Sequence, residues 1–407
     1  MPDSSKSWRR NQLVVVIVTF VGFTGSTLVM PFLALYIQQL GVTETGEIAL
    51  WTGLTLGSTP AITALCAPFW GRVADRYGNK ILVQRSLLSF VIVMAAMASV
   101  QSAWQLFVLR ALQGLFAGYG PLTLSMAARS APREKMAKAI GEVQTAQRIG
   151  PAVGPVIGGF LAAAVGQRHA FLVAAGVYAL ALVVVTAFYA EPTRPALGAA
   201  TRERVSFQDI LAFENFVLLT GLILAVQTIE RSFGPVIPLY ARQGGFAGGR
   251  VELVSGLLFS AAAISGALGH QLAGTLLRRT SARAVLAMSL PVSAVGLAIF
   301  PTVNSLWTLI AAFSAFGLGA GTAMTAAFTA AGGVIPRHAH GTSFGVLTSA
   351  SLLGTSFGPV FGGLIAGRSI RAVFLVGAVG LGMLALVVRR VMVERQPHVE
   401  LPPASES

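Results

Sequence analysis

Long apolar stretches separated by short polar loops make up almost the whole chain. Twelve of them hold about 20 mainly apolar residues each, enough for a helix to cross a bilayer. They lie near 12–38, 48–70, 81–100, 105–128, 138–164, 168–190, 214–241, 251–276, 284–301, 305–330, 341–366 and 370–390. The first is about twice as long as a signal-peptide core, so we expect it to be retained. The pattern predicts an all-α membrane protein of twelve transmembrane helices without a separate soluble domain.

The composition supports this interpretation and excludes two other classes of protein. Of the 407 residues, 54% are hydrophobic and 11% are charged, whereas soluble domains carry about 25% charged residues. A soluble globular enzyme is therefore excluded, and so is a disordered chain, which needs low hydrophobicity and high charge. Cys66 is the only cysteine, which rules out an intramolecular disulfide.

The positive charge of the chain is distributed unevenly between the two sides of the expected membrane. The formal net charge is +14, and 21 of the 29 Lys and Arg residues fall in loops on the side of the N-terminus, against five on the other side. Basic loops stay in the cytoplasm, so both termini are expected there. The other three, Arg110, Arg148 and Arg231, lie inside apolar stretches. Topology thus accounts for the charge, and no nucleic-acid partner is expected.

The chain also resembles itself at an offset of 203–204 residues. Residues 150–159 recur as 354–363, and Pro132-Arg133 recurs as Pro336-Arg337. The repeat predicts an N-terminal six-helix half, residues 1–190, and a C-terminal half, residues 214–390. A cytoplasmic linker, 191–213, would join them, and 391–407 would form a cytoplasmic tail. Two parallel, pseudo-symmetric halves around a central cavity are a known plan for transporters.

Three short segments combine residues in an order that basic or apolar composition alone does not explain. Segment 71–80 is a Gly-rich basic loop with one acid, and it contains Gly71, Asp75, Arg76 and Gly78. Arg110 lies inside the stretch 105–128, where a charge costs about 2.5–3.5 kcal/mol on insertion scales, so it should face a cavity or a carboxylate. The stretch 138–164 carries a glycine stripe that allows close helix contact and a proline that bends the helix: Gly150, Gly154, Pro155, Gly158 and Gly159.

These segments resemble motifs A, B and C of the major facilitator superfamily, and the resemblance covers essentially the whole chain. Val73 and Asn79 depart conservatively from motif A, and Arg278 replaces Asp75 in the sister loop. The resemblance implies that Asp75, with Gly71, Arg76 and Gly78, gates the cytoplasmic ends of the halves. It further implies a proton-coupling role for Arg110, for which a structural arginine that reaches the membrane surface is the alternative.

The likeness to motif C favours export over uptake, and segments 30–36, 68–71 and 371–376 resemble the twelve-span drug:proton antiporter branch of this superfamily. The implied activity is export of lipophilic, often cationic, drugs across a bacterial cytoplasmic (inner) membrane against inward proton flow, with alternating access of the two halves. A sugar or metabolite exporter and a uniporter, both on this fold, remain alternatives. A membrane-embedded enzyme is the most distant one, since no convincing catalytic constellation occurs in the sequence.

The candidates for proton coupling are Glu230, Arg110 and, in reserve, Glu142. Glu230 is the one acid deep inside an apolar stretch, where ionisable residues commonly relay protons; a structural ion pair with an Arg is the alternative. Glu230 and Arg231 are adjacent, so we expect them to pair poorly. The substrate is expected between the first, fourth, fifth, seventh, tenth and eleventh stretches, and the candidate cavity residues are Phe23, Gln144, Arg148, Gln227, Arg231 and Phe316.

No cofactor is expected. The five His residues lack metal-ligand spacing, and no phosphate-binding Gly-rich loop followed by Lys-Ser/Thr occurs. The expected partners are a lipophilic small molecule, protons and the lipid bilayer, and we expect a monomer.

Overall fold

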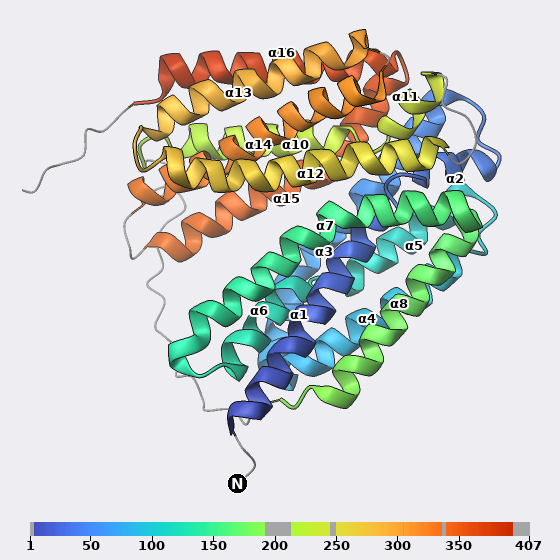
Figure 1. The fold of residues 1–407 in the computed structure, drawn as a ribbon, viewed down its shortest axis with the longest axis vertical. Helices are drawn as coiled ribbons and strands as arrows, with labels where there is room; N and C mark the ends of the chain where they lie inside the picture. Colours follow the sequence, from blue (N-terminus) through green and yellow to red (C-terminus); the bar gives the residue numbers. More distant parts are fainter. Residues whose placement is uncertain (1–3, 192–212, 245–249, 304, 336–338, 394–407) are drawn as a thin grey trace, which may run out of the picture.

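The computed structural model describes residues 4–191, 213–244, 250–303, 305–335 and 339–393, and these residues form helices and connecting loops without a strand. Figure 1 shows two groups of helices inclined to each other. They meet near α2 and α11 and diverge toward the end that carries the N-terminus. Most of the expected linker, 192–212, and of the expected tail, 394–407, lies outside the described residues.

The first group contains eight α-helices and one 3-10 helix. Their bounds are α1 Ser4–Leu28, α2 Leu33–Gln39, α3 Thr45–Tyr77, α4 Asn79–Met97, α5 Ala103–Phe116, α6 Tyr119–Ser130, η1 Arg133–Lys135, α7 Met136–Val165 and α8 Gln167–Phe188.

The second group follows the same scheme. Its elements are α10 Phe216–Ser232, α11 Ile237–Gln243, α12 Arg250–Leu276, α13 Ala282–Ile299, η2 Phe300–Thr302, α14 Leu306–Val334, α15 His340–Ala366 and α16 Ile370–Val391.

Every apolar stretch of the sequence is helical, but not every one is a single long helix. Ten helices of the described chain are long and apolar enough to cross a membrane, and the pair α10 and α11, bent by 41°, makes eleven. The stretch 105–128, expected as one span, is divided into α5 and α6, with 14 and 12 residues. Gly118 causes the break, because its φ of 92° is a left-handed conformation that cannot continue a right-handed helix.

The two groups repeat one packing scheme. In the first group, α1 packs against α7, α3 against α5, and α4 against α8. The second group pairs α10 with α15, α12 with α14, and α13 with α16. Each of the six helices named in the second group stands at the repeat position of its counterpart in the first group. The sequence repeat therefore corresponds to a repeated arrangement of helices.

Two helix pairs, α3 with α15 and α7 with α12, hold the groups together. Both contacts depend on glycine. A Cβ on Gly53 would collide with the carbonyl oxygen of Pro359, and a Cβ on Gly256 would collide with that of Pro155. The two contacts are equivalent under the sequence repeat. Small residues let helix backbones approach this closely.

Further contacts between the groups lie at one end of the bundle. Gly46 at the start of α3 approaches Gly367 just after α15, and a Cβ on Gly46 would lie 3.0 Å from the Cα of Gly367. At the same end, Nε2 of Gln167 donates to Oε1 of the buried Glu252 at 3.0 Å. The molecule is therefore closed at the end away from the N-terminus.

Candidate functional site

A cavity of about 570 Å³ lies between the two groups of helices. Its wall comes from the end of α1 and from α7 in the first group, and from α10, α12 and α14 in the second. The fourth and eleventh apolar stretches were expected to contribute. They form α5, α6 and α15, and no described residue of these helices lines this cavity. The eighth stretch, α12, contributes instead. The cavity is thus asymmetric, with most of its wall in the second group.

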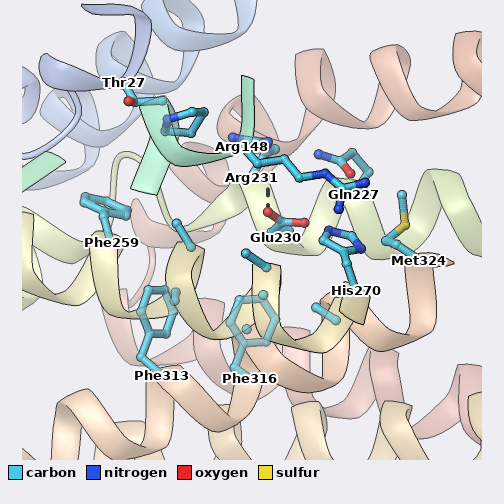
Figure 2. A pocket seen from close by; sticks show the side chains of 18 of the residues that line it. Thr27, Arg148, Gln227, Glu230, Arg231, Phe259, His270, Phe313, Phe316 and Met324 are labelled. Carbon is cyan, nitrogen blue, oxygen red and sulfur yellow. Dashed lines mark ion pairs between the residues drawn. The ribbon is translucent and has the colours of Figure 1, made fainter. Parts of the chain in front are cut away.

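The polar side of the cavity gathers charged groups from both groups of helices (Figure 2). Gln227, Glu230 and Arg231 project from α10, and Arg148 reaches the same space from α7. Oε1 of Glu230 lies 3.9 Å from Nη2 of Arg231. This distance allows electrostatic attraction but exceeds that of a hydrogen bond. Adjacent residues therefore approach each other more closely than expected, without forming a direct hydrogen bond.

Glu230 and Arg231 remain accessible from the cavity. Their side chains are 38% and 33% exposed, although both lie in the middle of the bundle. Gln227, one turn earlier on α10, is buried. An ionisable group that faces a water-accessible cavity inside a membrane protein can exchange protons with that cavity. Glu230 therefore faces the cavity, and its role in proton coupling stays a prediction.

His270 completes the polar side, although it was not among the expected cavity residues. Its Nδ1 lies 2.7 Å from Oγ1 of Thr325 on α14, and its electrostatic neighbours are Arg148 and Glu230. The histidines entered the expectations only as metal ligands. A titratable side chain in the apolar sequence of α12 was the signal available.

The opposite side of the cavity is apolar and aromatic. Phe259 of α12, together with Phe313, Phe316 and Phe328 of α14, forms this wall, whereas Met324 lies beside His270 (Figure 2). The ring of Phe316 stacks on that of Phe313, with their centroids 5.4 Å apart. Aromatic and methionine side chains accept lipophilic molecules of varied shape. The cavity therefore offers one apolar side and one charged side to a bound molecule.

Two of the residues expected in the cavity lie elsewhere. Phe23 packs between α1 and α6, 5.6 Å from the ring of Tyr119, and its Cβ faces Gly150. Gln144 is exposed on α7, one turn before Arg148, but does not line the cavity. The close approach of Gly150 on α7 to α1 keeps the side chain of Phe23 within the first group of helices.

The structure buries Arg110 in the first group, away from the central cavity. Only 4% of the residue is exposed, and Nη1 donates to Oε1 of Gln113 at 2.8 Å. Tyr178 is its electrostatic neighbour. The expectation that Arg110 faces a cavity or a carboxylate is therefore not met among the described residues, since a neutral amide one turn along α5 accepts its hydrogen bond.

Glu142 also lies apart from Glu230. It accepts a hydrogen bond from Nε2 of Gln12 at 3.0 Å and lies 4.0 Å from Nζ of Lys138. Its side chain lines a second cavity near the start of α7.

The glycines of the stripe on α7 have two different partners. A Cβ on Gly150, Gly154 or Gly158 would collide with α1, whereas Gly159 faces the backbone of Glu252 on α12. The stripe therefore fixes α7 within its own group, and Gly159 fixes it against the other group. Gly354, Gly358 and Gly362 on α15 contact α10 in the same way, and Gly363 contacts Ala49 of α3.

The segment 71–80, expected to be a loop, is mostly helix. Helix α3 continues through it to Tyr77, and the chain turns only at Gly78, whose φ is 93°. The guanidinium of Arg76 lies 5.5 Å from the centroid of the Tyr77 ring. Gly71 and Asp75 lie on this helix, but the placement of the Asp75 side chain lies outside the described residues.

A carboxylate stabilises the turn at Gly78. The backbone N–H of Asn79, the first residue of α4, donates to Oε1 of Glu191 at 2.8 Å. A negative charge at a helix N-terminus is favourable because unpaired N–H groups and the helix dipole are directed toward it. This contact joins the end of segment 71–80 to Glu191, three residues after the end of α8.

Comparisons with known proteins agree with the arrangement. The family model described as Major Facilitator Superfamily matches residues 15–302 and 252–407. The chain is 32% identical over 311 residues to the multidrug resistance protein MdtG of Salmonella paratyphi A, covering 75% of this chain and 76% of the relative. The MdtG proteins of Enterobacter lignolyticus and Escherichia fergusonii are also 32% identical over 75% of this chain, covering 74% and 76% of their own lengths.

Two solved structures share the fold. A bacterial homologue of the human lysosomal transporter Spinster, in an inward-facing and unoccupied conformation, superposes with a TM-score of 0.74 at 15% identity and covers 95% of both chains. The occupied inward-facing form gives a TM-score of 0.73 at 16% identity, covering 95% of this chain and 98% of that one.

Proposed function

Because the chain belongs to the major facilitator superfamily, we propose that it exports lipophilic small molecules in exchange for protons, by alternating access of its two halves. The observation that carries this proposal is the central cavity. It lies between two repeated groups of helices and combines an aromatic wall with the carboxylate of Glu230. The MdtG relatives, named as multidrug resistance proteins, support a drug-like substrate.

The cavity suits a molecule with a large apolar surface and a small polar part. Phe259, Phe313, Phe316 and Phe328 would contact the apolar surface. Arg148 and Arg231 would donate hydrogen bonds to acceptors of the substrate, and Glu230 would accept one from a donor group. Since two guanidinium groups face one carboxylate, a neutral or zwitterionic lipophile fits this charge balance better than a cation does.

Competition at Glu230 would couple the two fluxes. A donor group of the substrate hydrogen-bonds best to the ionised carboxylate, so substrate binding favours release of a proton. By linkage, protonation lowers the affinity for substrate to the same degree. Exchange of one ligand for the other at a single site is the behaviour of an antiporter.

Movement at the contacts between the halves would expose the cavity to alternate sides. In this conformation the halves are closed at the end away from the N-terminus, where α3 meets α15 and α7 meets α12. With both termini in the cytoplasm of a bacterial inner membrane, as the basic loops predict, this conformation faces inward. Rocking of two rigid repeats about such contacts is the common mode of alternating access.

A sugar or metabolite exporter and a uniporter remain alternatives on this fold. A sugar exporter needs a cavity rich in hydrogen-bonding groups. The phenylalanine and methionine side chains that line this cavity disfavour a sugar as its substrate. A uniporter would use the same cavity without proton exchange.

Transport by the purified full chain in liposomes distinguishes these possibilities. We expect a fluorescent neutral lipophile to move against its concentration gradient when a pH gradient is imposed, and to stop when a protonophore is added. Equal transport with and without the gradient would identify a uniporter and contradict proton antiport.

A further inference from the structure

A second cavity lies at the end of the bundle that carries the N-terminus. It has a volume of about 660 Å³ and is formed by the first turns of α1, by η1 and by the start of α7. Its lining residues are Trp8, Arg9, Gln12, Leu13, Val16, Glu134, Lys135, Lys138 and Glu142. It shares no lining residue with the central cavity, so the proposed transport route does not account for it.

The charges of this second cavity are mixed, with an excess of cations. Arg9, Lys135 and Lys138 oppose Glu134 and Glu142, which leaves one positive charge in excess. The carboxylate of Glu142 is already engaged, because it lies 4.0 Å from Nζ of Lys138 and accepts a hydrogen bond from Gln12. The cavity therefore suits a ligand with a single net negative charge better than a neutral one.

Gln12 adds a buried polar group that has an unused acceptor. The residue is 4% exposed, and its Nε2 donates to the carbonyl oxygen of Ala139 at 2.8 Å and to Glu142 at 3.0 Å. Its Oε1 has no hydrogen-bond partner among the described residues. This oxygen is itself covered by protein, so Gln12 joins α1 to α7 at the floor of the cavity and leaves the basic side chains to contact a ligand.

An apolar surface continues from the cavity along α1. Leu13 and Ile17 follow Arg9 at four-residue intervals on one helix face and are 61% and 40% exposed. Figure 1 shows α1 at the front of the bundle between α7 and α8, so this face is directed outward. Trp8 lies at the polar end, 5.4 Å from Nζ of Lys135. Tryptophan and basic residues near helix ends mark the level of lipid headgroups.

We propose that this second cavity binds the headgroup of one anionic glycerophospholipid. The phosphodiester lies against Arg9, Lys135 and Lys138, and the acyl chains follow Leu13, Val16 and Ile17. Basic pockets between membrane helices are suited to anionic headgroups. A phosphatidylglycerol headgroup supplies one negative charge and therefore matches the single positive charge in excess.

Binding would add a link between three segments at this end of the bundle. The lipid would bridge the first turns of α1 to η1 and to α7, so its effect should appear as stabilisation of the folded protein. This effect does not require that the chain transports drugs or protons, and the two proposals can fail separately.

Thermal unfolding of the delipidated, detergent-purified full chain tests the proposal. We expect dioleoylphosphatidylglycerol to raise Tm by several degrees more than dioleoylphosphatidylcholine or dioleoylphosphatidylethanolamine. Soluble glycerol 3-phosphate should leave Tm unchanged, because it lacks the acyl chains. The extra stabilisation should fall to the phosphatidylcholine level in the double variant Lys135→Gln, Lys138→Gln.

Arg390→Gln is the matched control, since it removes an exposed cation in the last turn of α16, outside the cavity. It should respond to phosphatidylglycerol as the unchanged protein does. Equal stabilisation of the double variant would overturn the site, and equal stabilisation by glycerol 3-phosphate would overturn the lipid as its ligand.

Native mass spectrometry of the unchanged protein provides a test that does not depend on folding of a variant. From an equimolar lipid mixture, one phosphatidylglycerol should be retained in preference to phosphatidylcholine, and retention without preference would contradict the proposal.

Discussion

Oε1 of Glu230 lies 3.9 Å from Nη2 of Arg231 at the wall of the central cavity, although the two residues are neighbours in the chain. Arg148 reaches the same region from the other group of helices. The carboxylate thus faces a cavity that is lined by guanidinium groups from both halves. Any movement of the halves changes the distance from Arg148 to Glu230, whereas the neighbouring Arg231 moves with Glu230 on α10.

Replacement of Arg148 should change the charge preference of the cavity. Arg148→Gln keeps hydrogen-bonding capacity but leaves one guanidinium against one carboxylate. We expect a lipophilic cation to bind several-fold more tightly to this variant, and a neutral analogue of the same size to bind nearly unchanged. Tryptophan fluorescence titration with the two ligands measures the ratio. Arg168→Gln, which changes an arginine outside the cavity, should keep the original ratio.

His270 should contribute a pH dependence separate from that of Glu230. Imidazole changes charge between about pH 5 and pH 8, and protonation adds a positive charge beside Arg148. In a Glu230→Gln background, the affinity for a lipophilic cation should therefore fall as pH falls through this range. Adding His270→Asn should remove that dependence.

His169→Asn serves as the control for this experiment, because His169 is exposed on α8 and lies outside the cavity. A pH dependence that persists in the His270→Asn variant would assign the titration to another group.

A side chain added at Gly256 should limit closure of the halves. A methyl group there would collide with the carbonyl oxygen of Pro155, and such overpacking typically costs about 1–3 kcal/mol. We expect Gly256→Ala to lower Tm and to slow transport. Gly176→Ala is matched in chemistry, but its Cβ would meet nothing within 4 Å. Similar losses in both variants would show that helix propensity alone is responsible.

A disulfide across the closed end should stop transport. Gly46 and Gly367 approach closely enough for the pair Gly46→Cys, Gly367→Cys to be bridged, after Cys66→Ala removes the native thiol. Oxidation should abolish transport, and reduction should restore it. Each single-cysteine variant should be insensitive to oxidant. Full transport by the cross-linked protein would contradict alternating access through this contact.

The helices and their repetition could be predicted from the sequence because apolar length and glycine spacing are local properties. The offset between residues 150–159 and 354–363 indicated the repeated packing that the structure shows. The break at Gly118 was missed, since a glycine in an apolar run is compatible with a continuous helix. Similarly, nothing local indicated that α3 would continue through segment 71–80 to Tyr77.

The cavity could be predicted only in part, since it depends on how helices face each other. Arg148, Gln227, Glu230 and Arg231 were found because charged and polar groups in apolar stretches are rare and therefore informative. Phe23 was placed wrongly in the cavity, because an aromatic side chain in a membrane helix has no local signal for its orientation. His270 was missed although it carries the same signal, a titratable side chain in an apolar stretch, because the histidines were judged only by metal-ligand spacing.

The most direct test of proton exchange at Glu230 is the release of protons when substrate binds to the purified protein. In weakly buffered detergent solution, a neutral lipophile should release protons from the unchanged protein, and the pH indicator should report a signal proportional to the amount bound. Glu230→Gln should bind the same lipophile without releasing protons. Release of equal size from Glu230→Gln would contradict the account, because another group would then carry the exchanged proton.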